Sequence, residues 1–248
     1  MRANNAVNTT DVLNTGEVQY RKSVDVGTLF VIDAKHLPFG RSVWPRVSRS
    51  TACWRRDRSG PREWRWTSLR RLTWWVLVER RVLEAEHGPT QMEHNKMALH
   101  SHGQHCVQQQ NVTQVGQSLK RNCIGPTGAG VYGRRDAGKS PQQGLKDAGG
   151  GAFAMQFDQA GIFVWFWSWS TSRQPLSDNR SMEMKLTDWG TPSAAFPAAG
   201  CDISEEFAAQ YLVFTITLCG LWAGVPDVYG EDCNGTYVRP PSPYTYSM

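Results

Sequence analysis

The chain has 248 residues, of which 40% are hydrophobic, 20% charged and 11% aromatic. This composition excludes a disordered or collagen-like chain, and the length is enough for one large domain with a substantial core. The 23 Gly and 13 Pro favour many turns over long helices.

The positive charge of the chain is concentrated in one window, residues 46–81. This window holds 11 Arg and three acidic residues, so its net charge is +8, whereas the whole chain carries +5 and the remainder therefore −3. Outside the window the chain is mildly acidic. The overall basic balance is thus poor evidence for a nucleic-acid partner, and we expect none.

The N-terminal half predicts short strands separated by irregular segments. Residues 28–33 form a β-rich run, and residues 36–40 are typical of a turn. The window 46–81 carries five Trp and its Arg residues at irregular intervals, so we expect neither a strand nor an amphipathic helix there. Residues 106–151 are polar and Gly-rich, which indicates a long loop region or an irregular set of hairpins.

The C-terminal half gives the sharpest signals. Residues 152–157 and 162–169 are β-rich runs on either side of a turn at 158–161, which predicts an antiparallel hairpin. Residues 210–218 predict another strand, and residues 204–210 one or two helical turns. Many short strands with long loops predict an all-β sandwich, and we expect one domain over residues 1–248.

The apolar stretch 208–225 is the strongest candidate for a membrane span. It is 18 residues long but contains Gln210, Thr215, Thr217 and two Gly. These polar and small residues make it marginal for crossing a bilayer, so we expect no membrane span.

Cysteines and glycosylation motifs indicate an oxidising, secretory origin. There are six Cys, an even number, and four Asn-x-Ser/Thr motifs, at Asn8, Asn111, Asn179 and Asn234. Residues 1–10 are polar and lack the apolar core of a signal peptide, so we expect the targeting segment to be absent from this chain. The pairing we favour is Cys106 with Cys123, which would close a polar loop.

Two groups of side chains are candidates for a functional site, one catalytic and one metal-binding. Glu79 and Glu84 are five positions apart, so a regular strand would place them on opposite faces, but a bulge would bring them to one face. Two carboxylates about 5–5.5 Å apart suit a retaining glycosidase, whereas a solvated surface pair is the alternative. The second group is rich in potential metal ligands and comprises His87, His94, His100, His102, His105 and Cys106. Its spacing fits no common structural zinc pattern, so we expect ordinary histidines, no metal and no cofactor.

Several segments together resemble the fungal laminarinase-like endo-β-1,3(4)-glucanases of glycoside hydrolase family 16. The order and spacing agree over some 75 residues of the C-terminal half, in segments 149–157, 161–167, 188–192, 196–197, 201–203 and 218–224. Segments 8–10, 21–24, 27–45 and 83–101 are also similar to the family. The resemblance covers about 170 of the 248 residues.

The resemblance implies a fold, a reaction and a set of site residues. The implied fold is a jelly-roll β-sandwich of the concanavalin-like type with a concave sugar-binding groove. The family motif E-[IV]-D-[IV]-x-E falls on residues 79–84, which implies Glu79 as nucleophile and Glu84 as acid/base in retaining hydrolysis of β-1,3- or β-1,3(4)-glucan. Trp44 matches a groove-wall Trp and His100 a groove His. The resemblance also implies a secreted protein, which we expect to be a monomer.

The chain departs from the family in several places, three of which bear on its fold and function. Arg81 replaces the Asp of the motif, and a cation there would hold the pKa of the glutamates down, the wrong direction for a general acid. The N-terminal strands of the family are missing, so we expect an incomplete jelly roll. The window 46–81 lacks family character, which indicates out-of-frame or intronic translation or, alternatively, a cationic insert that binds carbohydrate or nucleic acid. A non-catalytic β-glucan-binding jelly roll and an inactive gene-model product therefore remain alternative functions.

Overall fold

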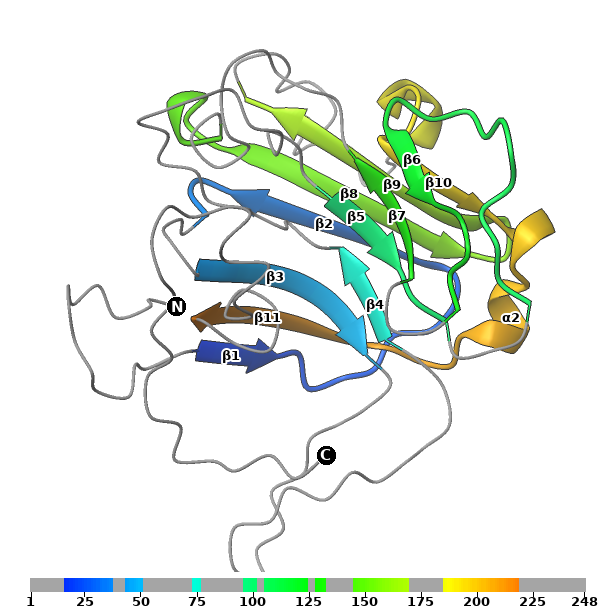
Figure 1. The fold of residues 1–248 in the computed structure, drawn as a ribbon. Coiled ribbons are helices and arrows are strands. Elements are labelled where there is room, and N and C mark those ends of the chain that lie inside the picture. The colour runs from blue at the N-terminus through cyan, green and yellow to red at the C-terminus, as the bar shows by residue number, and fades with distance from the viewer. Residues whose placement is uncertain are drawn as a thin grey trace, which may run out of the picture.

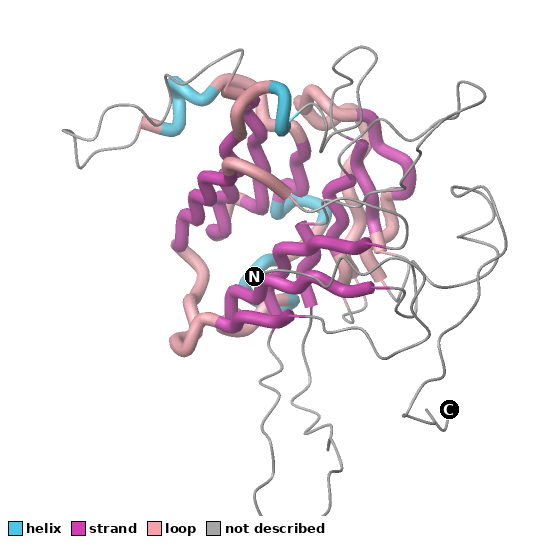
Figure 2. The backbone as a smooth tube through the Cα atoms, turned by 90° about the vertical axis from the view of Figure 1, so that its left-hand side faces the viewer, coloured by secondary structure: helices cyan, strands magenta, loops and turns pink. Residues whose placement is uncertain are grey.

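Two antiparallel sheets form the body of the molecule (Figure 1). The computed structural model describes residues 16–37, 43–50, 73–76, 96–101, 105–124, 128–132, 145–169 and 185–218. The larger sheet has seven strands in the order β1-β11-β3-β4-β5-β7-β6, and the smaller has four in the order β10-β9-β8-β2. Strands make up most of the described chain and the helices are short (Figure 2), which confirms the prediction of an all-β sandwich.

The bounds of the elements are as follows. The larger sheet contains β1 (Gly16–Gln19), β3 (Val43–Ser50), β4 (Thr73–Val76), β5 (Lys96–Leu99), β6 (Gln117–Lys120), β7 (Ala129–Tyr132) and β11 (Tyr211–Leu218). The smaller sheet contains β2 (Thr28–Ala34), β8 (Gly151–Asp158), β9 (Gly161–Ser168) and β10 (Ala194–Pro197). The helical turns include η2 (Leu186–Trp189), η3 (Ala198–Gly200) and α2 (Ile203–Glu206), and residues 145–147 form a further short turn.

The hairpin predicted in the C-terminal half is β8 and β9, which pair along their whole length. Asp158 begins the turn, because its Oδ1 accepts a hydrogen bond of 2.8 Å from the Ala160 backbone N–H. Gly161 ends it at φ +142°, where a Cβ atom would lie 2.6 Å from the Phe196 carbonyl oxygen. The predicted strands at 28–33 and 210–218 are also confirmed, as β2 and β11.

All of β4 and most of β3 lie inside the Arg- and Trp-rich window. Residues 46–50 belong to β3 and Thr73–Val76 form β4, so the prediction that 46–81 contains no strand is wrong for these two segments. β3 pairs with β11 along its full length and with β4 on its other side. Backbone hydrogen bonding to two neighbours thus stabilises both strands, although the window as a whole shows no regular two-residue period.

The predicted helical segment at 204–210 begins slightly earlier and is shorter. α2 is a single turn whose N-cap is Asp202, since its Oδ1 accepts hydrogen bonds from the backbone N–H groups of Ser204 at 2.9 Å and Glu205 at 3.2 Å. The Ser204 hydroxyl donates to the same oxygen at 2.7 Å. This hydroxyl, followed by the Glu205 N–H, holds the pKa of Asp202 below its ordinary value.

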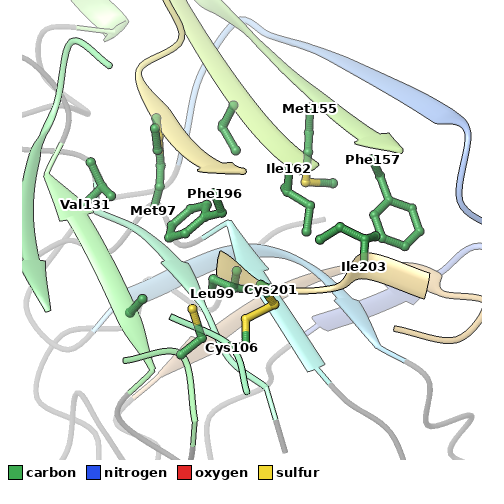
Figure 3. Close-up of a cluster of buried hydrophobic side chains, with 14 of the residues drawn as sticks. Met97, Leu99, Cys106, Val131, Met155, Phe157, Ile162, Phe196, Cys201 and Ile203 are labelled. Carbon is green, nitrogen blue, oxygen red and sulfur yellow. A yellow bond between two sulfur atoms is a disulfide. The ribbon is translucent and has the colours of Figure 1, made fainter. Parts of the chain in front are cut away.

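The main core lies between the sheets (Figure 3), where the labelled side chains of β8 and β9 point towards Ile203 and Phe196. Alternate residues of the strands supply it, as the two-residue period of a strand requires. The ring of Phe157 meets that of Phe207 edge-on, with centroids 6.3 Å apart. The buried residues of this core are Met97, Leu99, Cys106, Cys123, Ala129, Val131, Met155, Phe157, Ile162, Val164, Ala194, Phe196, Cys201, Ile203 and Phe207.

A second, smaller cluster lies on the opposite face of β9. Trp165 and Trp189 pack edge-to-face with ring centroids 5.3 Å apart, and the Trp165 Nε1–H donates to the Gly190 carbonyl at 3.0 Å. Ala154 stands directly opposite Trp165 in the β8–β9 pairing and joins the same cluster. The small Ala leaves room for the indole, and the cluster ties η2 to the four-stranded sheet.

Among the described residues, a disulfide joins Cys106 to Cys201, so the predicted pairing of Cys106 with Cys123 is wrong. Cys106 and Cys201 form an antiparallel bridge with their Cα atoms 4.1 Å apart, although 95 positions separate them in the chain. Cys123 is on the other side of Cys106, where its backbone N–H donates to the Cys106 carbonyl at 2.9 Å. Its thiol is free, and burial raises its pKa from 9.0 to about 12.

Candidate functional site

The candidate site is the face of the seven-stranded sheet that is turned away from the core. On β5, Met97 and Leu99 are core residues with 1% and 0% exposure. Because side chains alternate along a strand, Ala98 and the position of His100 belong to the opposite, outer face. His100 directly follows β5 and is half-buried.

The strand register places the position of Trp44 on the same outer face. Ser48 pairs with Trp75, and Trp75 pairs with Ala98, so these three positions share one face. Trp44 lies four residues before Ser48 on β3 and therefore shares that face. β3 and β5 run in the same direction, which separates Trp44 from His100 by roughly 20 Å along the strands at about 3.3 Å per residue. One sugar ring cannot contact both positions, so a ligand that uses both has to be a chain of several sugars.

The backbone around His100 is closely constrained. Gly128 has φ +53°, and a Cβ atom there would lie 2.6 Å from Nδ1 of His100, so only glycine leaves room for this imidazole. The next residue, Ser101, donates its backbone N–H to the Cys123 carbonyl at 2.6 Å and its hydroxyl to the carboxylate of Glu206. Ser101 and Glu206 are both buried. These contacts fix the chain immediately after His100.

Glu206 is a residue that the sequence analysis missed. It is 8% exposed on α2 and reaches Ser101, which is 105 positions earlier in the chain. A buried carboxylate in a one-turn helix has no signature in a single sequence, because its partner is brought to it only by the packing of α2 against the end of β5. Its role here is to hold the segment that carries His100.

The predicted catalytic pair, Glu79 and Glu84, lies outside the described residues, as does Arg81. In the chain they follow Val76, the last residue of β4, and precede Lys96, the first residue of β5. These two strands are hydrogen-bonded neighbours in the sheet that carries the positions of Trp44 and His100. The roles of Glu79, Glu84, Trp44 and His100 remain predictions.

The cluster of potential metal ligands is only partly described. His87, His94 and His102 lie outside the described residues. Cys106 is in a disulfide and so provides no thiolate ligand. In the part of the chain that the structure covers, no three His, Cys, Asp or Glu residues are grouped so that they could hold a metal ion.

Comparison with known proteins defines the class. The family model described as the XgeA-like, catalytic domain of glycoside hydrolase family 16 matches residues 82–245. A probable glycosidase of Schizosaccharomyces pombe is 28% identical over 214 residues, which span 84% of this chain and 44% of that protein. A probable endo-1,3(4)-β-glucanase of Aspergillus niger is 28% identical over 215 residues, which span 82% of this chain and 25% of that protein.

A solved structure of the same family is also similar to this chain. The structure is laminarinase 16A of Phanerochaete chrysosporium, with β-glucans (6-O-glucosyl-laminaritriose) in its donor and acceptor sites. It superposes with a TM-score of 0.71 at 26% identity and covers 96% of this chain and 74% of its own. The comparison confirms the predicted jelly-roll sandwich.

The chain belongs to glycoside hydrolase family 16, in its XgeA-like group. It spans less than half the length of the two curated relatives described above. Among the described residues, no helix combines the length and apolar character needed to cross a membrane.

Proposed function

We propose that this protein hydrolyses β-1,3- or β-1,3(4)-glucan with retention of configuration. The observation that carries the proposal is the match of residues 82–245 to the catalytic domain of the family. The similar relatives include a probable endo-1,3(4)-β-glucanase, and the similar solved structure holds β-glucans. The register of the seven-stranded sheet supports a long binding face that takes several sugar units between Trp44 and His100.

In the proposed mechanism two glutamates act in turn. Glu79 attacks the anomeric carbon while Glu84 protonates the leaving glycosidic oxygen, which gives a covalent glycosyl-enzyme. Glu84 then removes a proton from water, and the water releases the sugar with its original configuration. Trp44 would stack on a sugar face, and His100 would hydrogen-bond to the substrate near the catalytic pair.

The direct test is hydrolysis of laminarin by the purified chain, followed as release of reducing sugar. We expect Glu84→Gln to lower kcat by about 10²–10⁴-fold, the usual contribution of general acid/base catalysis. Glu205→Gln is the matched control, because Glu205 is exposed on α2. An undiminished rate in Glu84→Gln would contradict the assignment. NMR of the first anomer released tests retention.

Arg81 supports a second candidate, a β-glucan-binding protein without turnover. A guanidinium beside the glutamates would hold their pKa low and so remove the general acid. On this candidate the chain is retained on insoluble β-glucan without releasing reducing sugar, and Arg81→Asp increases hydrolysis. Absence of both binding and turnover would instead support an inactive gene product.

We also propose that the protein is secreted and acts as a monomer. The Cys106–Cys201 disulfide supports passage through an oxidising compartment, as do the four Asn-x-Ser/Thr motifs. Export to the medium behind a cleavable leader, followed by light scattering on the purified chain, tests both points. Retention on immobilised duplex DNA at physiological salt would contradict our expectation of no nucleic-acid partner.

A further inference from the structure

One of the four glycosylation motifs, Asn111-Val112-Thr113, lies in the described part of the chain. Asn111 is in a turn with φ +59°, a left-handed conformation that Asn tolerates better than most residues. Asn111 and Thr113 are both exposed. An N-linked glycan requires this arrangement in the folded chain, because the attached sugar has to remain outside it.

Hydrogen bonds of the Gln108 and Gln114 side chains hold the two ends of this turn against β10. The Gln108 side-chain amide donates to Oε1 of Gln114 at 3.0 Å and to the Ala195 carbonyl at 2.7 Å. The Ala195 backbone N–H donates to the same Gln114 oxygen at 3.0 Å. Both ends of the turn are therefore tied to β10, and the residues between them are directed outward.

In the described part of the chain, the acceptor side chain makes no hydrogen bond that would compete with glycosylation. Within the described residues, neither the Asn111 amide nor the Thr113 hydroxyl makes a hydrogen bond. Asn122 provides a contrast, since it is exposed but its Oδ1 accepts from the Ile124 backbone N–H at 2.9 Å, and no hydroxyl residue follows two positions later.

Two neighbouring features favour modification of this turn. The disulfide residue Cys106 lies shortly before it, and disulfides form in the same lumen in which N-linked glycans are added. Three large apolar side chains that flank Asn111 in sequence are exposed, namely Val107 at 44%, Val115 at 45% and Leu119 at 43%. A glycan on Asn111 adds hydrophilic bulk to a segment that otherwise presents apolar surface.

We propose that Asn111 carries an N-linked glycan, an inference that rests on the proposed secretory route. The donor is a lipid-linked oligosaccharide pyrophosphate, and the catalyst is a lumenal oligosaccharyl transferase. The Asn111 amide nitrogen forms a bond to the anomeric carbon of the donor, and the bond from that carbon to the pyrophosphate oxygen breaks. The amide loses one proton to a base of the transferase, the lipid pyrophosphate leaves, and no oxidation occurs.

The test is expression of the full chain behind a cleavable secretion leader in a yeast host, followed by peptide mass mapping. We expect a glycopeptide at Asn111 and, after enzymatic release of the glycan, conversion of Asn111 to Asp. Asn111→Gln and Thr113→Ala remove this glycopeptide. Thr113→Ser, which preserves the motif, retains it. The peptide that contains Asn122 stays unmodified.

Peptides from microsomal fractions are mapped as well as peptides from the medium. The glycan is added in the lumen, so a chain that is held there and not exported also shows whether Asn111 is modified. An unmodified Asn111 in chains that have entered the lumen would overturn the proposal, whether or not another motif is occupied. Loss of laminarin hydrolysis with an intact Asn111 glycopeptide would count against the proposed function and leave this inference standing.

Discussion

The β8–β9 hairpin and the β3–β4 pair reach the same antiparallel arrangement from very different sequences. β8 and β9 carry aromatic residues on both sides of a turn that Asp158 and Gly161 specify, and β9 also carries the β-branched Ile162 and Val164. Most of β3 and all of β4 lie in the window 46–81 of irregular Arg and Trp residues, and their pairing joins β11 to β5. The comparison shows that a strand can also form where the sequence has no regular alternation of apolar and polar residues. Backbone hydrogen bonds to the strands on either side then stabilise the extended conformation.

The largest expected effect tests the hairpin side of the comparison. Phe157 is 1% exposed and packs edge-on against Phe207. We expect Phe157→Ala to lower the free energy of unfolding by about 3–5 kcal/mol, through lost burial and a residual cavity. Urea denaturation measures it. Leu119→Ala, at a side chain that is 43% exposed, is the control and should change stability by no more than about 0.5 kcal/mol. Equal effects of the two substitutions would show that this core is not formed.

The next effect concerns the cross-link. Cys201→Ser should lower the free energy of unfolding by about 2–5 kcal/mol, because the bond closes a loop of 95 positions. Cys123→Ala should lower the free energy of unfolding by less than Cys201→Ser does. In the unchanged chain the Cys123 thiol should resist alkylation at pH 8, since burial raises its pKa to about 12. Because this pKa is raised, the contribution of the protonated thiol is present below pH 9 and is lost as the pH rises towards 12. A Cys106–Cys123 peptide in a non-reducing digest would contradict the assignment.

The third prediction tests the β3–β4 side directly. Ser48 pairs with both Val213 and Trp75, as expected in a central strand. Ser48→Pro should cost about 2–3 kcal/mol, because proline removes a ladder donor and leaves its acceptor unpaired. Ser48→Ala retains the N–H and is the matched control. If proline were tolerated as well as alanine in thermal denaturation, β3 would not be a central strand.

The smallest effect is at α2. Asp202→Ala removes the N-cap and should lower Tm by a few degrees, and Asp202→Asn should recover part of this loss. Because the folded-state pKa of Asp202 is below its ordinary value, its stabilising contribution is present at neutral pH. It is lost as the pH falls below about 4, through that lowered pKa. Thermal melts of the two variants at pH 7 and pH 3 measure the effect, and an equal deficit at both pH values would contradict the cap.

The sequence predicts candidate residues for the site, but it does not predict how the strands that carry them are arranged. The family motif indicates Glu79 and Glu84, and flanking similarity indicates Trp44 and His100. That the positions of Trp44 and His100 share a face depends on the register in which β4 pairs with β3 and β5, and a single sequence does not show that register. The contact between Glu206 and Ser101 depends on packing between elements far apart in the chain.

By itself the sequence determined the all-β class, the β8–β9 hairpin, β2, β11 and membership of glycoside hydrolase family 16, because these depend on short-range periodicity, turn residues and ordered motifs. Tertiary structure alone decided that Cys106 pairs with Cys201 and not with Cys123, and that residues 46–50 and Thr73–Val76 are strands. The physical reason is that backbone hydrogen bonds between strands form between whichever segments the fold brings side by side, and separation along the chain does not reveal that proximity.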